Sequence, residues 1–177
     1  EMWDEADGFF YDVLRLPDGG ATRLKVRSIV GLLPLVGMAV FEEDIVDKLP
    51  RFTERARVFA RRHPELVANV HLPSLPGVAG RRMLAIVDEA KLRRILARML
   101  DENEFFSPYG IRSLSRHHLE QPYVFHHGGQ DYRVAYVPGD SDSGMFGGNS
   151  NWRGPVWMPI NYLLYTALLR LFAYYGE

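Results

Sequence analysis

The chain has no cysteine among its 177 residues. This absence excludes a disulfide framework, a thiolate metal site and a cysteine nucleophile. It agrees with a reducing compartment, and we expect a cytoplasmic protein. Lysine and arginine (21) nearly balance aspartate and glutamate (22), which leaves a net charge of -1. Because there is no basic excess, we predict no nucleic-acid partner.

Long hydrophobic runs are missing as well. The charge-free stretch Ile29–Phe41 has 13 residues and contains Pro34, whereas a membrane-spanning helix needs about 20. We therefore predict no membrane segment and interpret this stretch as part of a buried core helix.

Hydrophobic residues make up 47% of the chain and aromatic residues 12%, which is typical of a globular domain. Apolar periodicity predicts helices over Leu24–Phe41, Pro50–Arg62, a segment that Asp88 can cap, and Met158–Tyr175 with Pro159 in its first turn. The last helix is expected to bury one face, made of Ile160, Leu163, Leu164, Ala167, Leu168, Leu171 and Phe172.

Turn residues predict short strands between and beside these helices. The turns are expected at Asp7-Gly8, at Pro17–Gly20 and at Gly128-Gly129. Between Asn103 and Asn151 the chain is irregular, far beyond the usual connection of about 4–6 residues, and loops of that length are commonly functional. The predicted fold is mainly α, with long loops and short β hairpins.

One glycine-rich turn carries unusual chemistry: GGNSNWRGPVW, residues 147–157. Its glycines permit close backbone approach, the asparagines and Arg153 supply hydrogen-bonding groups, and Trp152 and Trp157 offer flat apolar faces. Sugars present C–H faces and rims of hydroxyl groups, so this combination suits a carbohydrate. The alternative is a pair of core tryptophans at a helix entry.

Two further clusters are candidates. SPYGIRSLS, residues 107–115, brings together Tyr109, Arg112 and serines, although an arginine that braces neighbouring carbonyls explains it equally well. WDEADGFFYD, residues 3–12, contains Trp3, Tyr11 and four acids. Paired carboxylates can hydrolyse glycosides, but acids in a turn are more often solvated.

No metal or cofactor is predicted. The histidines lack metal-ligand spacing, and there is no phosphate-binding glycine loop or GxSxG nucleophile turn. Asp140 and Asp142 stand in an oxygen-rich PGDSDSG loop that could hold calcium, but the spacing of an EF-hand is absent and a surface turn is favoured.

Taken in order, the segments WDEADGFFYD, SPYGIRSLS and FGGNSNWRGPVWMPINYLL resemble the C-terminal catalytic domain of bacterial members of glycoside hydrolase family 63. The eukaryotic relatives of this family are the processing mannosyl-oligosaccharide glucosidases. The resemblance covers essentially the whole chain, and its most specific element is WRGPVW.

The resemblance implies a toroid of twelve helices in two rings, the (α/α)6 fold, and inverting hydrolysis of an α-glycosidic bond. It implies that Trp152, Gly154 and Trp157 wall the glycone subsite with Arg153 beside them, and that Tyr11 and Arg112 are further contacts. An oligosaccharide or glycoside would be the substrate.

The chain departs from the family in length. In the family the general acid lies before the region that this chain resembles, and the general base lies well after the WRGPVW helix. We therefore expect residues 1–177 to be a single segment of an (α/α)6-barrel catalytic domain, truncated at both ends, without a catalytic residue and inactive alone. Self-association is expected through exposed faces of Leu24–Phe41 or Met158–Tyr175.

Two other functions remain open at this point. The chain could be a non-catalytic carbohydrate-binding or helical interaction module that uses the same tryptophans, or a helical structural protein in which they are core residues.

Overall fold

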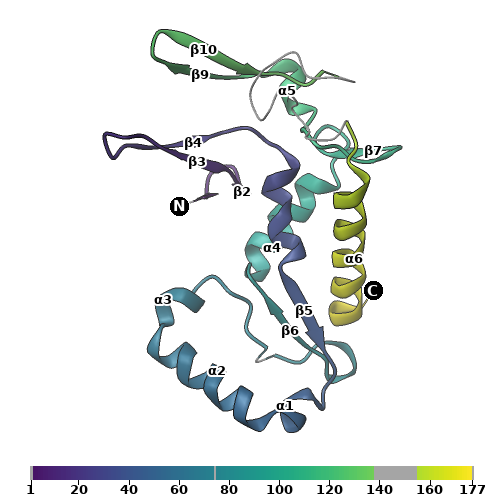
Figure 1. Cartoon of the computed structure of the whole chain (residues 1–177). Helices are drawn as coiled ribbons and strands as arrows, with labels where there is room; N and C mark the ends of the chain where they lie inside the picture. The colour runs from purple at the N-terminus through teal and green to yellow at the C-terminus, as the bar shows by residue number, and fades with distance from the viewer. Residues whose placement is uncertain (1, 74, 138–154, 177) are drawn as a thin grey trace. The chain divides into compact units, whose positions relative to one another are not determined.

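The computed structural model describes residues 2–73, 75–137 and 155–176. Helices account for 41% of the described residues and strands for 24%. The chain is therefore a mixed protein in which helices alternate with short hairpins, rather than a mainly helical one (Figure 1).

Four of the helices in the described part of the chain have only three or four residues. The full set is η1 (Ile29–Val36, a 3-10 helix), α1 (Ile45–Lys48), α2 (Pro50–Arg62), α3 (Pro64–Val67), η2 (Val78–Gly80, also 3-10), α4 (Glu89–Met99), α5 (His117–Glu120) and α6 (Met158–Tyr175). The strands form antiparallel pairs: β1 (Trp3–Asp4) with β2 (Phe9–Phe10), β3 (Asp12–Arg15) with β4 (Ala21–Leu24), β5 (Met38–Phe41) with β6 (Arg82–Ala85), β7 (Phe106–Ser107) with β8 (Gly110–Ile111), and β9 (Tyr123–His127) with β10 (Gln130–Val134).

The predictions from local sequence signals are largely confirmed. The helices α2, α4 and α6 form where the apolar periodicity indicates, and Asp88 caps α4 by accepting a hydrogen bond from the amide of Lys91 at 2.8 Å. The predicted turns join β1 to β2, β3 to β4 and β9 to β10. Gly128 and Gly129 both adopt positive φ in the last of these turns, which suits glycine.

The predicted continuous helix over Leu24–Phe41 is wrong. Leu24 ends β4, residues 29–36 form a 3-10 helix, and residues 38–41 pair with β6. Pro34 lacks the amide that an α-helix would need there. At Gly31 an added Cβ would lie 2.5 Å from the carbonyl oxygen of Phe10, so this segment packs closely against the N-terminal hairpin.

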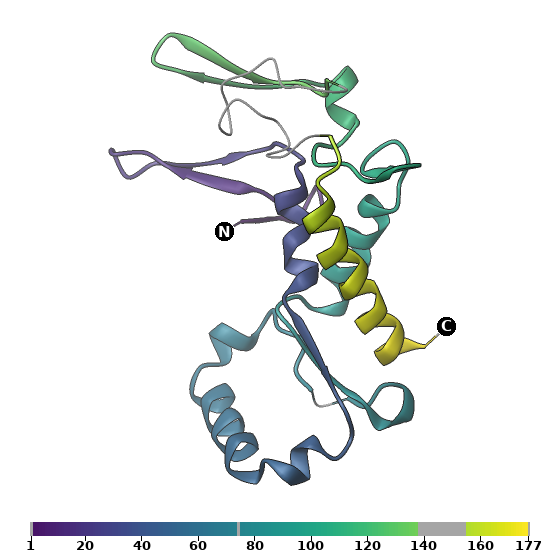
Figure 2. The same cartoon turned by 45° about the vertical axis from the view of Figure 1, so that its right-hand side comes forward.

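Two apolar faces are more exposed than predicted. No residue of α2 is buried, and Phe52 and Phe59 are 68% and 50% exposed. The helix lies with α1 and α3 in the excursion that connects β5 to β6 (Figure 2). In α6 the buried residues are Leu164, Ala167, Leu171 and Tyr174, whereas Leu163 and Phe172, both predicted to face inward, are exposed.

The chain divides into two compact units. Unit 1 comprises Glu1–Leu33 and Arg93–Tyr162, and unit 2 comprises Pro34–Leu92 and Leu163–Glu177. The core of unit 1 includes the stacked rings of Phe9 and Phe105, whose centroids are 5.7 Å apart.

In unit 2 the C-terminal part of α6 is tied to the loop before β6. The hydroxyl of Tyr174 donates to the carbonyl of Leu75 at 3.1 Å, and Arg81 donates to the carbonyl of Ala173 at 3.1 Å. Among the helices that the structure describes, none combines the length and apolar character needed to cross a membrane.

Replacing Asp88 by alanine is expected to lower the free energy of unfolding by about 1 kcal/mol, because the cap of α4 is lost. Urea denaturation of the 177-residue chain measures this. Asp88→Asn is the matched control, since asparagine also caps helices; an equal loss in both variants would contradict the capping role and leave the ion pair with Lys91, at 2.7 Å, as the cause.

Candidate functional site

Backbone hydrogen bonds bring together segments that are far apart in the sequence of unit 1. The amide of Ser113 donates to the carbonyl of Pro155 at 2.9 Å, and the carbonyl of Ser113 accepts from the amide of Ile29 at 2.7 Å. Two residues further on, the amide of Ser115 donates to the carbonyl of Arg27 at 2.8 Å. The SPYGIRSLS segment therefore lies between the entry to η1 and the start of the described part of the tryptophan segment.

Asn161 fastens the same segment to the first turn of α6. Its Oδ1 accepts a hydrogen bond from the amide of Ile111 at 2.6 Å, and its Nδ2 donates to the carbonyls of Ile111 at 3.0 Å and Trp157 at 3.1 Å. The side-chain amide thus acts as a strand partner for β8. A Cβ at Gly110, which has φ of +127°, would lie 2.8 Å from Asn161 Oδ1.

The sequence analysis missed Asn161. The signal available was a lone amide in the first turn of an otherwise apolar helix, where a polar residue needs a partner.

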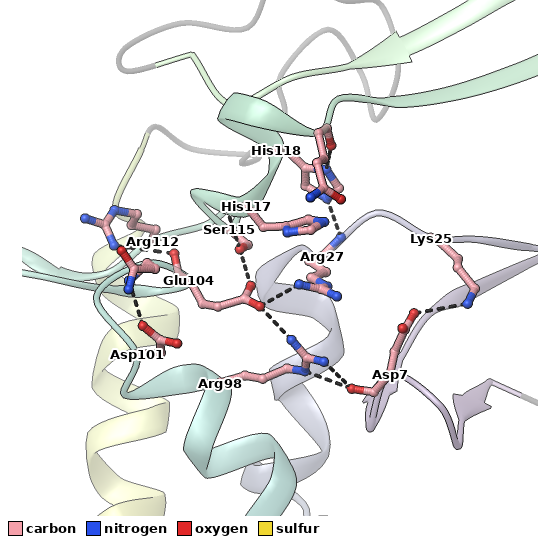
Figure 3. A network of polar contacts seen from close by, with 12 residues as sticks. Asp7, Lys25, Arg27, Arg98, Asp101, Glu104, Arg112, Ser115, His117 and His118 are labelled. Carbon is pink, nitrogen blue, oxygen red and sulfur yellow. Dashed lines mark hydrogen bonds and ion pairs between the residues drawn. The ribbon is translucent and has the colours of Figure 1, made fainter.

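The buried carboxylate of Glu104 binds three side chains from different segments of unit 1 (Figure 3). Glu104 accepts hydrogen bonds from Arg27 Nη1 at 2.5 Å, from Arg98 Nη1 at 2.6 Å and from the hydroxyl of Ser115. Its side chain is only 10% exposed. Because a buried carboxylate is costly unless it is paired and hydrogen-bonded, these four residues, the Glu104 network, hold α4, the loop after it and the SPYGIRSLS segment together.

The N-terminal hairpin joins the network through a backbone carbonyl. Arg98, which contacts Glu104, also donates from Nε to the carbonyl oxygen of Asp7 at 2.9 Å (Figure 3). The first two segments that carry the family resemblance and residues 155–162 of the third are therefore connected within unit 1.

The acids of the N-terminal hairpin are ion-paired. Lys25 Nζ lies 3.0 Å from Asp4 Oδ2 and 3.1 Å from Asp7 Oδ2. The amide of Asp7 and then Lys25 hold the pKa of Asp4 below its usual value. Burial would raise the pKa of Asp7, but hydrogen bonds from Lys25 and Tyr11 outweigh it, and that pKa is lowered too. Both groups are ionised at neutral pH, so neither can act as a general acid.

The sequence favoured the interpretation that the acids of this turn are solvated. For Asp4 the structure corrects this interpretation. Asp4 is 6% exposed, and its Oδ1 accepts the amide of Asp7 at 3.0 Å. The carboxylate caps its own turn while it binds Lys25, which explains an acid in a buried position.

Tyr11, one of the predicted sugar contacts, is a core residue that is 2% exposed. Its hydroxyl donates to Asp7 Oδ2 at 3.0 Å and accepts from Arg27 Nε at 3.4 Å. Burial raises the pKa of the phenol. The ring packs edge-on against Phe9, with centroids 5.4 Å apart.

Arg112, another predicted contact, is half-buried and braces the loop after α4. Its Nη1 donates to the carbonyls of Glu102 at 3.0 Å, Glu104 at 3.4 Å and Phe106. This is the bracing role that the sequence analysis kept open.

Trp157 is the described member of the predicted tryptophan pair. It is half-buried, and its carbonyl also accepts the amide of Asn161 at 3.1 Å. Trp152, Arg153 and Gly154 lie outside the described residues, as do Asp140 and Asp142 of the candidate calcium loop. Within the described ranges, no group of three or more metal-ligating acids and histidines is present.

His118 is buried in a single protonation state. Its Nε2 accepts the amide of Arg27 at 2.8 Å, so Nδ1 must carry the proton and donate to the carbonyl of Gln121 at 2.9 Å. Burial lowers the pKa of His118. Burial and the charge of Arg27 also lower the pKa of His117. Both imidazoles are therefore neutral at pH 7.

Comparison with known proteins identifies the class. Residues 82–174, just over half of the chain, match the model of the Mannosylglycerate hydrolase MGH1-like glycoside hydrolase domain. The matched region contains α4, the Glu104–Ser115 loop, Trp157 and most of α6. The chain therefore belongs to the MGH1-like glycoside hydrolase domain family.

Individual relatives agree with this assignment. The chain is 46% identical over 177 residues to an uncharacterized protein of Saccharomyces cerevisiae, covering 99% of this chain and 16% of that protein. It is 35% identical over 81 residues to a probable mannosyl-oligosaccharide glucosidase of Schizosaccharomyces pombe, covering 46% of this chain and 7% of that protein. It is 37% identical over 79 residues to mannosyl-oligosaccharide glucosidase of Saccharomyces cerevisiae, covering 44% of this chain and 6% of that protein.

The resemblance to family 63 and its glucosidases is thus confirmed. The chain spans less than a fifth of the length of these relatives.

We expect Glu104→Gln to lower the free energy of unfolding by about 3 kcal/mol, since it leaves Arg27 and Arg98 without their carboxylate while keeping the side-chain volume. Urea denaturation at pH 7.5 gives the value. Glu102→Gln, at an exposed neighbouring position, is the control; similar small effects in both variants would show that the network does not organise unit 1.

Acid should destabilise the protein through His118. Because its folded pKa lies below the unfolded value of about 6.5, the stability contributed by the neutral ring is complete above pH 6.5 and is lost as pH falls below that value. Denaturation midpoints at pH 8 and pH 5.5 should differ less in His118→Gln than in the unmodified chain. His127→Gln, at an exposed position, should keep the full difference, and an unchanged pH response of His118→Gln would refute the assignment.

Proposed function

We propose that residues 1–177 form one segment of an (α/α)6 catalytic domain of a glycoside hydrolase, and that this segment supplies one wall of the glycone subsite for an α-glycosidic substrate. The observation that carries the proposal is the family match over residues 82–174. The bonds that join Ser113 to Pro155 and Ile111 to Asn161 support it, because they fix the described part of the tryptophan segment to the SPYGIRSLS segment.

The surface of α6 supports the toroid. One side of the helix is buried, and the opposite side exposes apolar residues: Tyr162, Tyr165, Leu169 and Phe172. A helix that is apolar all round suits a position covered on both sides. In a toroid of two concentric rings, a helix of the inner ring is covered in this way by its neighbours, which the chain alone does not provide.

The proposed subsite binds sugar through the residues of the tryptophan segment. Trp152 and Trp157 offer flat faces for the C–H surface of a pyranose, Gly154 permits close approach, and Arg153 hydrogen-bonds hydroxyl groups. We assign no catalytic residue to the chain. The ionised state of Asp4 and Asp7 speaks against either residue as the general acid, because an inverting enzyme needs a protonated carboxyl group in that role.

Tyr11 and Arg112 have a supporting role in this proposal. Both fix the frame on which the tryptophan segment rests, since their polar atoms are engaged with Asp7, Arg27 and backbone carbonyls. We further propose a reducing, cytoplasmic setting, which the absence of cysteine supports. Exposed apolar residues of α6 favour association of the isolated chain.

A non-catalytic carbohydrate-binding module is the second candidate. It is kept for the chain taken alone because neither Asp4 nor Asp7, both ionised, can supply the general acid of hydrolysis. A module would bind sugar without needing any further segment, whereas the proposed domain segment would contribute to hydrolysis only within a longer protein.

Hydrolysis of aryl α-glucosides and aryl α-mannosides distinguishes these functions, because the names of the relatives point to glucosyl and mannosyl compounds. We expect a longer protein containing this chain to release sugar with inversion, detected by NMR of the first-formed anomer, and the 177-residue chain to release none. Trp157→Phe in the longer protein should lower kcat/KM by about tenfold or more, as expected when a sugar-stacking surface is reduced.

Two outcomes would overturn the proposal. Hydrolysis by the 177-residue chain would show that its catalytic acids are within it. An inactive longer protein that still binds glycosides would favour the binding module.

A further inference from the structure

The loop after α4 and helix α5 line an open cavity of about 260 Å³ in unit 1, and Trp157 is not among the residues that line it. This volume is below the range of roughly 300–1,000 Å³ typical of drug-sized ligands, so it suits a ligand the size of one ring. The cavity is lined by Asn103, Arg116, His117, Leu119, Glu120 and Gln121.

The lining mixes hydrogen-bond donors and acceptors and carries no net charge. Arg116 and Glu120 offset one another, and His117 is neutral at pH 7 because burial lowers its pKa. The carboxamides of Asn103 and Gln121 each offer donors and an acceptor. Within the described part of the chain, no hydrogen bond or ion pair engages the polar side-chain atoms of Asn103, Arg116 or Glu120, so they are available to a ligand.

The walls of the cavity are held by the Glu104 network. The amide of Arg116 donates to the carbonyl of Glu104 at 2.9 Å, and the amide of His117 donates to Ser115 Oγ at 3.1 Å. Figure 3 shows His117 next to Ser115 above the Glu104 carboxylate. The backbone of the wall is thus fixed before a ligand binds, so the conformational entropy lost on binding is mainly that of the lining side chains.

We propose that this cavity is a second sugar subsite, which binds one neutral pyranose unit of an oligosaccharide apart from the unit that contacts Trp157. A sugar hydroxyl both donates and accepts, and the planar groups of Arg116, Glu120, Asn103 and Gln121 match that requirement. Leu119 supplies an apolar surface for the C–H face. The inference rests on the proposed function, because it takes a carbohydrate as the ligand.

The charge distribution argues against an anionic ligand. An anion would gain from Arg116 but would meet Glu120 in the same wall, and like charges in one site repel. A neutral hydroxylated ring uses both side chains.

Saturation-transfer NMR of the 177-residue chain with methyl α-D-glucopyranoside and methyl α-D-mannopyranoside tests the subsite. We expect binding of at least one glycoside, and an affinity about tenfold lower in the double variant Arg116→Gln/Glu120→Gln, which removes hydrogen bonds to charged groups. Arg51→Gln, at an exposed position in unit 2, is the matched control. Circular dichroism spectra and urea midpoints establish that each variant is folded.

The variants distinguish failure of this inference from failure of the proposed function. Loss of binding in the double variant, with binding retained in Trp157→Phe, supports the subsite even if the tryptophan wall is absent. Loss only in Trp157→Phe supports the wall and overturns the subsite. Binding of D-gluconate in preference to both glycosides, abolished at high salt, would overturn the neutral-ring assignment, and so would the absence of any glycoside binding.

Discussion

Neutralisation of the Glu104 carboxylate is the constraint on which the candidate site depends. A carboxylate that is 10% exposed requires charged partners, and these are Arg27, from the segment before η1, and Arg98, from α4. Arg98 reaches onward to the backbone of the N-terminal hairpin, and Ser115 places the SPYGIRSLS segment on the remaining carboxylate oxygen. Removing the carboxylate would leave two cations close together, so the N-terminal hairpin, α4 and the SPYGIRSLS segment are connected through a single group.

This arrangement gives the motifs of the resemblance different physical roles. The N-terminal hairpin and the SPYGIRSLS segment engage their polar groups within themselves or with neighbouring chain: Asp4 and Asp7 bind Lys25, Tyr11 binds Asp7, and Arg112 binds carbonyls. They form a frame. The tryptophan segment is attached to that frame through Pro155 and Asn161. In such a division of labour, a rigid scaffold positions a loop that contacts the ligand.

Local sequence signals sufficed to predict the helices and turns that are determined by residues within the same segment. The helix α4 follows from its apolar stripe and the Asp88 cap, and the β9–β10 turn follows from Gly128-Gly129. The segment Leu24–Phe41 could not be predicted from composition, because its conformation follows from Phe9 packing on Gly31 and from pairing of β5 with β6, at residues 82–85. Glu104 and Asn161 were missed for the same reason: their partners stand 77 and 50 residues away in the sequence.

The contacts of the N-terminal carboxylates also limit what the chain can do chemically. A general acid must hold a proton at neutral pH, and the environment of Asp4 and Asp7 removes that proton by supplying Lys25 and a backbone amide. These contacts make the hairpin a good structural element and a poor acid. Meanwhile α6 exposes Tyr165 and Phe172 on the side opposite its buried face, where a complete ring of helices would cover them. The ion pairs of Asp4 and Asp7 and the uncovered apolar face of α6 agree with the proposal that this segment positions a sugar and that other parts of a longer protein cleave it.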